Sequence, residues 1–391
     1  MRKVIAGLIS FILVTGMMVP TTWAAEKEEQ KAEIQFAENA SSAIIMERDT
    51  GEVLYEKNSE ESLPPASMTK IMTMLLIMEA IDKKQLKYED MIRASENAAS
   101  MGGSQIFLEP GEEMSVQDML KGIAVASGND ASVAMAEHLG GTEAGFADMM
   151  NEKAKELGLE KTHFSNSNGL PIENHYTSAH DLAVIAKELL KYDDITKFTG
   201  IYEDYLRQDT DNPFWLVNTN KLVRFYPGVD GLKTGFTKEA KYGLTATAEK
   251  DGMRIIAVVM GSPTPKERNA DVTTMLDFAF SQYKTHKLHE RNEAVGEVEI
   301  SKGQQKKVKA VTGESISILT KKTESIDQVE EKIELNENMK APILKGDEIG
   351  TLIVENGGKV VSETPLVAED EVLEASWWTL FKRVLGGFGG N

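Results

Sequence analysis

A serine and a lysine three residues apart carry the strongest chemical signal in the sequence. Two prolines precede Ser67, and the stretch after Lys70 is apolar on every side, as in a buried helix. Residues three apart lie on one face of a helix, so the Lys70 amine would reach the Ser67 hydroxyl. A serine becomes nucleophilic when a base takes its proton, and a lysine can be that base where its surroundings disfavour the ammonium form.

This spacing alone is a weak signal. It recurs at Ser281 and Lys284, where nothing else supports chemistry. Taken in isolation, Ser67 and Lys70 are better explained as a serine at a helix N-terminus and a lysine whose amine extends to solvent.

Two further motifs strengthen the functional interpretation. Ser127-Gly128-Asn129 lies between a predicted helix over 116–126 and another over 131–139, where it could place a hydroxyl and an amide in a cleft or simply form a helix–helix turn. Lys233-Thr234-Gly235 precedes a predicted hairpin whose turn is Asp251-Gly252, so the motif is expected on a sheet strand. A cation and a hydroxyl there suit a substrate carboxylate, and Gly235 would leave the backbone open to a bound peptide.

The three motifs together carry a resemblance. Ser-x-x-Lys, Ser-x-Asn and Lys-Thr-Gly, in this order, are typical of serine penicillin-recognising enzymes. Residues 127–131 and 230–237 resemble the D-alanyl-D-alanine carboxypeptidases among the low-molecular-mass penicillin-binding proteins, and the resemblance extends over nearly the whole chain after its first residues. It implies a serine hydrolase that removes the terminal D-alanine from peptidoglycan stem pentapeptides through an acyl-enzyme, which would limit cross-linking. β-Lactams would acylate the same serine. It implies no cofactor and no metal.

The resemblance also implies roles for individual residues. Ser67 would attack the carbonyl between the two D-alanines and lose its proton to Lys70. Ser127 would pass the proton to the leaving amine, and Asn129 would orient the acyl side chain and Lys70. Other residues of the expected site would bind the substrate. Its terminal carboxylate would contact Lys233, Thr234 and Gly235, and the backbone N–H groups of Ser67 and Phe236 would form the oxyanion hole. Arg268 would assist at the carboxylate or would be a solvated surface charge.

The implied fold is an α/β penicillin-recognising (β-lactamase-like) domain, an antiparallel sheet with flanking helices, followed by a β-rich domain. The composition agrees with two domains, because the sequence changes near residue 290 from long apolar stretches to short alternating segments separated by glycine turns. The expected organisation is a signal peptide over 1–24, an extension over 25–41, the catalytic domain over 42–289, the β-rich domain over 290–368 and a tail over 369–391.

The first residues predict export. Arg2 and Lys3 precede an apolar run over 4–19, and small side chains lead to Ala24, which is the pattern of a cleavable signal peptide. An uncleaved membrane anchor is the alternative, because the run is of borderline spanning length. Either way we expect the body outside the cytoplasm, at the outer face of the membrane or in the cell-wall compartment.

The tail predicts an amphipathic helix. Its apolar arc suits an anionic membrane interface, with Lys382 and Arg383 opposite, although a helix docked on its own domain is the alternative. The residues expected at the membrane are Trp377, Trp378, Phe381, Val384, Leu385 and Phe388.

Composition and missing motifs exclude other classes. The net charge of −19 disfavours nucleic acid as a partner, and the absence of cysteine excludes disulfides and thiolate chemistry. His175 and His180 flank a predicted loop, so we interpret them as turn or surface residues rather than a zinc pair. A β-lactamase is disfavoured because no Glu-x-x-Leu-Asn lies between Ser127 and Lys233. A penicillin-sensing or cell-wall-binding protein with little turnover stays an alternative.

Overall fold

The structure is a computed structural model that describes residues 35–324, 326 and 328–388, with the backbone alone for 384–388. The predicted signal peptide and most of the predicted extension lie outside the described residues. Of the part of the chain that is described, no helix is both long and apolar enough to cross a membrane.

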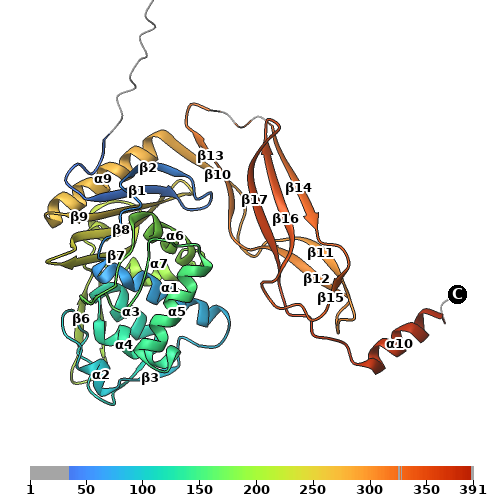
Figure 1. Cartoon of the computed structure of the whole chain (residues 1–391), viewed down its shortest axis with the longest axis horizontal. Coiled ribbons are helices and arrows are strands. Elements are labelled where there is room, and N and C mark those ends of the chain that lie inside the picture. Colours follow the sequence, from blue (N-terminus) through green and yellow to red (C-terminus); the bar gives the residue numbers. More distant parts are fainter. Residues whose placement is uncertain (1–34, 325, 327, 389–391) are drawn as a thin grey trace, which may run out of the picture. The chain divides into compact units, whose positions relative to one another are not determined.

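A five-stranded antiparallel sheet forms the centre of the first domain (Figure 1). The neighbouring strands β1 and β9 are buried almost throughout, because helices cover both faces, and their sequences are accordingly continuous apolar runs rather than alternating ones. Asp251 and Gly252 both have positive φ in the turn that joins β8 to β9, which confirms the predicted hairpin. In sheet order the strands are β2 (Val53–Lys57), β1 (Ser42–Glu47), β9 (Met253–Ser262), β8 (Lys241–Lys250) and β7 (Val229–Thr237).

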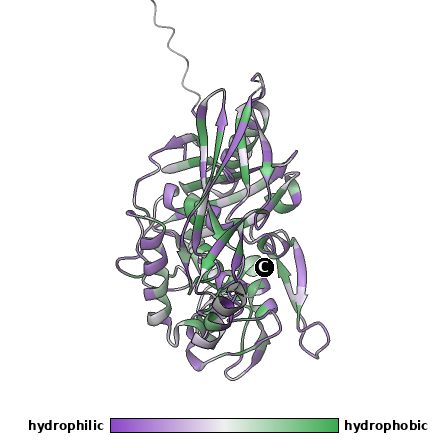
Figure 2. Cartoon of the chain, turned by 90° about the vertical axis from the view of Figure 1, so that its right-hand side faces the viewer, coloured by the Kyte–Doolittle hydropathy of each residue, from purple (hydrophilic) through white to green (hydrophobic). Residues whose placement is uncertain are grey.

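Helix α9 (Pro265–Gln282) packs on one face of this sheet, and α6 (Ala179–Leu189) packs on the other face together with a helical lobe (Figure 1). In Figure 2 the green, hydrophobic ribbon segments are concentrated in the central strands and the helices beside them, where two apolar clusters lie on opposite sides of the sheet. The remaining elements are η1 (Ala66–Thr69), α1 (Lys70–Asp82), β3 (Met91–Arg93), α2 (Glu96–Ala99), β4 (Glu113–Ser115), α3 (Val116–Ala126), α4 (Asn129–Gly140), α5 (Glu143–Glu156), α7 (Ile195–Thr199), β5 (Glu203–Leu206), β6 (Phe214–Val217) and α8 (Leu222–Phe225).

The predicted β-rich region is present and has its own apolar core. Strand β10 (Tyr283–His289) pairs with β13 (Ile316–Lys321) in a two-stranded sheet, so pairing with this region begins before residue 290. A six-stranded sheet follows, and α10 (Trp377–Phe388) ends the described chain. The six strands, in sheet order, are β14 (Val329–Leu335), β16 (Glu348–Asn356), β17 (Lys359–Ala368), β12 (Lys307–Thr312), β11 (Ala294–Ser301) and β15 (Met339–Lys340).

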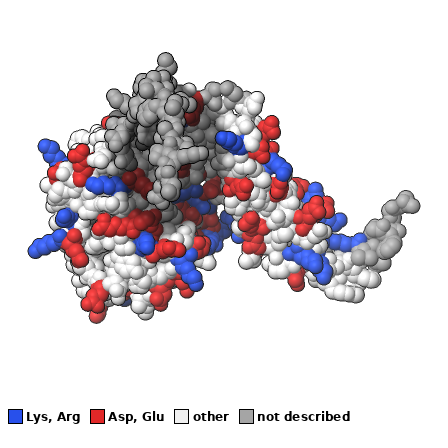
Figure 3. All heavy atoms as spheres, turned by 45° about the horizontal axis from the view of Figure 1, so that its top comes forward, with Lys and Arg blue, Asp and Glu red and all other residues white. Residues whose placement is uncertain are grey.

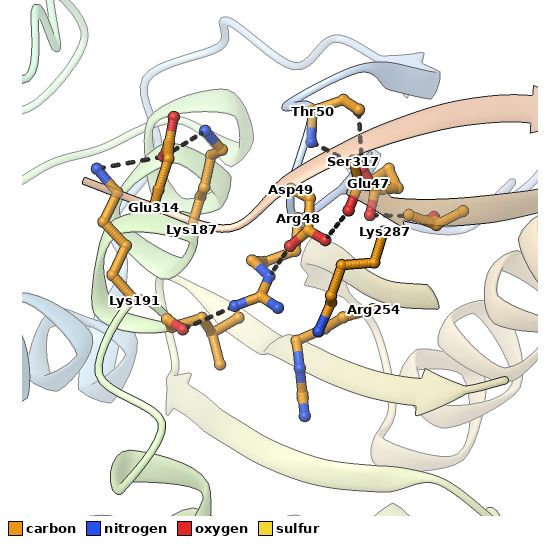
Figure 4. Close-up of polar contacts among 12 residues, drawn as sticks. Glu47, Arg48, Asp49, Thr50, Lys187, Lys191, Arg254, Lys287, Glu314 and Ser317 are labelled. Atoms are coloured by element: carbon orange, nitrogen blue, oxygen red, sulfur yellow. Dashed lines mark hydrogen bonds and ion pairs between the residues drawn. The ribbon is translucent and has the colours of Figure 1, made fainter. Parts of the chain in front are cut away.

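Polar contacts link the end of β1 to the β10–β13 pair (Figure 4). The Ser317 hydroxyl donates to the Asp49 carboxylate at 2.6 Å, and Lys187 on α6 lies 3.2 Å from a Glu314 oxygen. Figure 3 shows acidic side chains widely distributed over the viewed face, as the net charge of −19 requires. This surface would repel polyanions.

Candidate active site

Ser67 lies in the short 3-10 helix η1, one turn before α1 begins at Lys70. The expected first turn of a helix is therefore a 3-10 turn, and the three-residue spacing still brings the two side chains together. The Lys70 Nζ lies 3.2 Å from the Ser67 Oγ. Helix α1 is buried from Lys70 to Ala80, as its apolar sequence predicts.

The Lys70 amine is fully buried, and this burial is the largest cause that holds its pKa well below the usual range. The nearby charge of Lys233 lowers the pKa further, while Asp130 acts in the opposite direction. Burial disfavours the ammonium form because the charge loses its hydration. The structure therefore supplies the environment that a lysine base needs.

Three oxygens surround the Lys70 amine. Its Nζ lies 2.6 Å from the Asn129 Oδ1 and 2.7 Å from the Asn168 backbone oxygen, in addition to the Ser67 Oγ. The first two are carbonyl oxygens and can only accept hydrogen bonds. An ammonium would donate to all three oxygens. A neutral amine, the form that burial favours, would give its two N–H groups to the carbonyls and keep its lone pair for the Ser67 proton.

Ser127 lies at the end of α3, and Asn129 is the first residue of α4. Asn129 is buried, and its side-chain amide also donates to the Gly102 oxygen at 2.6 Å, which fixes the carbonyl that faces Lys70. Ser127 is buried in a left-handed conformation at the C-terminus of α3. Its hydroxyl makes no side-chain hydrogen bond to Ser67 or Lys70 among the described residues. A role for Ser127 in proton transfer stays a prediction.

Lys233 and Arg268 place two buried cations side by side. Lys233 lies on β7 and is 1% exposed, and burial, with the charge of Arg268, lowers its pKa to about 7. Arg268 lies near the start of α9, is 6% exposed and has its pKa lowered to about 10 by burial. Neither cation forms a salt bridge with a carboxylate among the described residues. Unpaired buried cations are costly, so the pair suits an anionic ligand, and Arg268 is not a solvated surface charge.

Thr234 is paired with a residue that sequence reasoning missed. Its hydroxyl donates to the Thr219 Oγ1 at 2.8 Å. Thr219 follows β6, and its backbone N–H donates to the Val125 oxygen near the end of α3. No local motif marks this threonine, because only its contacts with Thr234 on β7 and with Val125 on α3 bring it to the site.

Gly235 lies against the turn that carries Ser67. A Cβ at this position would lie 2.7 Å from the Pro65 oxygen and 3.2 Å from the Met68 side chain. The sequence interpretation gave Gly235 the task of leaving space for a bound peptide, whereas here the absent side chain lets β7 approach η1. The neighbouring Phe236 has an exposed side chain that stacks on Tyr242 at a centroid distance of 4.3 Å.

A loop over 165–176, also missed by the sequence interpretation, supplies part of the site. It contributes the Asn168 oxygen to Lys70, and its Ser167 oxygen accepts a hydrogen bond from Thr73 on α1 at 2.6 Å. The Asn166 side chain accepts from the Gly169 N–H at 2.8 Å and so shapes the loop tip. Residues 169–176 of the loop and the segment over 62–66, with Thr237 and Glu239, line a pocket of about 510 Å³ that borders Ala66, the residue before Ser67.

We expect Gly169→Ala to disrupt this loop and reduce acylation of Ser67 strongly. Gly169 has φ +84°, and a Cβ there would lie 1.8 Å from the Ala66 oxygen, so backbone must move. Gly158→Ala is the matched control, because Gly158 has φ +71° but open space around it. Comparable losses of labelled-penicillin acylation and melting temperature in the two variants would contradict the close-approach explanation.

His175 lies in the predicted loop, directly after a turn, but it is buried and so is not a surface residue. His175 is 9% exposed, and its imidazole bonds the Thr69 hydroxyl beside the nucleophile. His180 is partly exposed and lies near Glu60 and Asp181, and these three side chains offer ligand atoms within 4.8 Å of one another. Asp181 is already engaged there, because it accepts hydrogen bonds from the Lys161 N–H and the Thr162 hydroxyl.

Helix α10 exposes the aromatic side chains expected at a membrane. Trp377, Trp378 and Phe381 stack on one another and are 72%, 55% and 40% exposed. Arg383 was expected on the polar side of the helix, opposite the apolar arc. In the structure its guanidinium donates hydrogen bonds to the Gly303 and Gln304 backbone oxygens of the β-rich region. The predicted anchor side chains of Val384, Leu385 and Phe388 lie outside the described side chains.

Two family models and a curated relative match this chain over most of its length. A family model described as D-alanyl-D-alanine carboxypeptidase matches residues 26–264, and one described as penicillin-binding protein 5, C-terminal domain, matches residues 283–374. The chain is 59% identical over 382 residues to D-alanyl-D-alanine carboxypeptidase DacF of Bacillus subtilis (strain 168), covering 97% of this chain and 98% of that protein.

Solved structures give the same result. Penicillin binding protein 5 from Haemophilus influenzae superimposes with a TM-score of 0.66 at 30% identity, covering 87% of this chain and 99% of that one. Penicillin-Binding Protein D2 from Listeria monocytogenes in its ampicillin-bound form matches with a TM-score of 0.56 at 30% identity, covering 62% of this chain and 98% of that one.

Proposed function

Because this chain belongs to the D-alanyl-D-alanine carboxypeptidase family, we propose that it removes the terminal D-alanine of peptidoglycan stem pentapeptides through an acyl-enzyme on Ser67. The chain is a serine D,D-carboxypeptidase on which β-lactams act. Removal of the terminal residue would limit cross-linking, since the bond between the two D-alanines is then no longer present. The observation that carries the proposal is the buried Lys70 amine, which lies 3.2 Å from the Ser67 hydroxyl and whose pKa is held well below its usual range, mainly by burial.

The proposed acylation begins at the Ser67 hydroxyl. Its proton passes to the Lys70 amine while the oxygen bonds to the carbonyl carbon between the two D-alanines. The negative charge that develops on the carbonyl oxygen is stabilised by the backbone N–H groups of Ser67 and Phe236. The carbon–nitrogen bond then breaks, Ser127 passes the proton to the leaving amine, and D-alanine departs. Water hydrolyses the remaining ester and regenerates Ser67.

The proposed carboxylate site contains Lys233, Thr234 and Arg268. The two buried cations have no carboxylate partner among the described residues, so the terminal carboxylate of the substrate would neutralise them. The Thr234 hydroxyl donates to Thr219 here, and it would turn its hydrogen to the substrate carboxylate, since a carboxylate only accepts. Asn129 holds Lys70 by one end of its amide and would face the acyl side chain as well.

The first test compares the wild-type chain without residues 1–24 with its Ser67→Ala variant. We expect D-alanine release from diacetyl-Lys-D-Ala-D-Ala and covalent labelling by penicillin in the wild type, and neither in the variant, because the nucleophile is gone. D-alanine is measured by enzymatic assay and labelling by gel fluorescence. Labelling without release in the wild type would support the alternative of a penicillin sensor. Release that persists in Ser67→Ala would refute the proposed nucleophile.

A β-lactamase is the other rival activity. Among the described residues, the partners of the Lys70 amine are Ser67, Asn129 and the Asn168 backbone oxygen, and none of these is a carboxylate that could activate water for fast ester hydrolysis. We therefore expect a long-lived penicilloyl-enzyme. Rapid turnover of the labelled penicillin would instead favour the β-lactamase.

We also propose that the chain is exported by residues 1–24 and that α10 binds an anionic membrane surface. The exposed aromatics of α10 support the second proposal, and Lys382 lies over the Trp378 ring at 5.5 Å, close to the same face. The export proposal predicts that the mature chain begins at Ala25, which N-terminal sequencing of the exported protein checks.

We expect the triple variant Trp377→Ser, Trp378→Ser and Phe381→Ser to lose binding to vesicles that contain anionic lipid. The aromatic side chains supply the apolar area that enters the interface, so their loss removes the driving force. Co-sedimentation with vesicles measures binding, and Phe225→Ser is the control, since that side chain is 69% exposed elsewhere on the surface. Equal sedimentation of the triple variant and the wild type would exclude the membrane role of α10.

A further inference from the structure

His175 joins the loop over 165–176 to the turn that carries Ser67. Its Nδ1 accepts a hydrogen bond from the Ser165 N–H at 3.0 Å, and its Nε2 lies 2.7 Å from the Thr69 Oγ1. Burial, with the nearby His163, lowers the pKa of His175 to about 4, so the ring is neutral at neutral pH. None of the sequence motifs contains this residue.

These contacts determine where the imidazole proton lies. Because Nδ1 accepts from a backbone N–H, it carries no hydrogen, and the neutral ring must carry its proton on Nε2. The Nε2–H therefore donates to the Thr69 oxygen. The Thr69 hydroxyl then has its own hydrogen free, and it donates to the Ala66 oxygen at 2.8 Å. The three groups form a directed chain of hydrogen bonds that ends on the carbonyl immediately before Ser67.

That carbonyl belongs to the same peptide group as the Ser67 N–H. A trans peptide is planar, with its oxygen and its hydrogen pointing in opposite directions, so fixing the oxygen also fixes the N–H. Ala66 has φ +48°, a conformation that is uncommon for a residue with a side chain and that the surrounding contacts must hold in place. Gly169 packs against the same oxygen from the loop side.

We propose that His175, acting through Thr69, is a positioning residue that aims the Ser67 N–H at the oxyanion of the acylation reaction. The inference rests on the proposed function, because it deepens the role of the oxyanion hole in that reaction. His175 touches neither the substrate nor the nucleophile oxygen. It acts on the orientation of one backbone donor, whose removal in other enzymes costs about 10²–10³ in rate.

Two pairs of variants separate this role from general support of the loop. Glutamine at position 175 can keep the donor that reaches Thr69, whereas asparagine can keep the acceptor for the Ser165 N–H but loses that donor. Thr69→Ser keeps the hydroxyl, and Thr69→Val removes it at nearly constant volume. We expect His175→Asn and Thr69→Val to slow penicillin acylation about 10–100-fold, as expected for a misdirected rather than absent donor. His175→Gln and Thr69→Ser should stay within a few-fold of the wild type.

The spectroscopic readout is the ester carbonyl band of the penicilloyl-enzyme, measured by infrared difference spectroscopy with a ¹³C-labelled carbonyl. A weaker hydrogen bond from the Ser67 N–H should shift this band to higher frequency in His175→Asn and Thr69→Val, and leave it unshifted in the conservative variants. The double variant with His175→Asn and Thr69→Val should be acylated no more slowly than the slower of the two single variants, because both substitutions break the same chain of hydrogen bonds.

Several results would overturn the inference. If His175→Gln were slower than His175→Asn, the acceptor for the loop would be the important contact. If rates fell together with melting temperature while the carbonyl band stayed in place, the role would be structural support. If all four variants matched the acylating wild type, the inference alone would fail, whereas a wild type that is never acylated would refute the proposed function itself.

Discussion

Lys70→Met is expected to slow acylation of Ser67 by about two to four orders of magnitude, the usual range for removal of a general base. The reason is specific to the contacts of the amine. Its two carbonyl partners can occupy both N–H groups, which leaves the lone pair for the Ser67 proton. Acylation is measured as the rate of labelled-penicillin incorporation under pseudo-first-order conditions.

Lys70→Arg separates the base from the charge. A guanidinium stays protonated at any pH that the protein tolerates, so Lys70→Arg keeps a cation but cannot accept the proton, and we expect a loss similar to that of Lys70→Met. Lys284→Met is the matched control, because Lys284 has the same spacing from Ser281 and lies on β10, outside the site. Acylation by Lys70→Arg at the wild-type rate would show that Lys70 acts as a charge rather than as a base.

The second large effect is expected for Lys233→Gln, which should lower kcat/KM and also shift its pH profile. Loss of a hydrogen bond to a charged group costs about 1.5–3 kcal/mol, so kcat/KM on the diacetyl-Lys-D-Ala-D-Ala peptide should fall about 10–100-fold. The second part is a change in the pH profile. Because the Lys233 charge lowers the pKa of Lys70, its removal should raise that pKa. Less Lys70 is then neutral at a given pH, and the acidic limb of the profile moves to higher pH.

The alkaline limb of the wild-type profile follows from Lys233 itself. Its pKa of about 7 in the free protein means that the ammonium group that binds the carboxylate is lost as the pH rises through 7. We therefore expect kcat/KM to decline above this pH in the wild type, as the titration of a coupled pair of lysines. Lys233→Arg should keep the cation and remove this limb. An alkaline limb that persists unchanged in Lys233→Arg would assign it to another group.

Local rules were sufficient to predict several parts of the site. The pairing of Ser67 with Lys70 depends only on the geometry of one helical turn, and a 3-10 turn in place of an α-helical one preserved it. The helix over 116–126 and the Asp251-Gly252 turn could likewise be predicted from the sequence, because hydrophobic periodicity and turn-forming residues act over a few positions. The motif Lys233-Thr234-Gly235 lies on a strand for the same reason.

Other members of the site could not be predicted, because the contacts that define them are long-range. The Asn168 oxygen reaches Lys70 from 98 positions away, and a backbone carbonyl leaves no signature in residue types. Thr219 contacts Thr234 through a side-chain hydrogen bond between residues 15 positions apart, which no local pattern marks. His175 was mistaken for a surface residue because a loop sequence does not tell whether the loop packs against a helix.

The sequence by itself determined the family and the α/β fold that the chain adopts, and it supplied the groups that we propose carry the chemistry. The tertiary structure decided the state of those groups. Whether Lys70 is a neutral base or a solvated ammonium depends on its burial and on Lys233, which lies 163 positions along the chain. Burial and electrostatic coupling are properties of atoms that meet in space, and spacing along the chain cannot specify them.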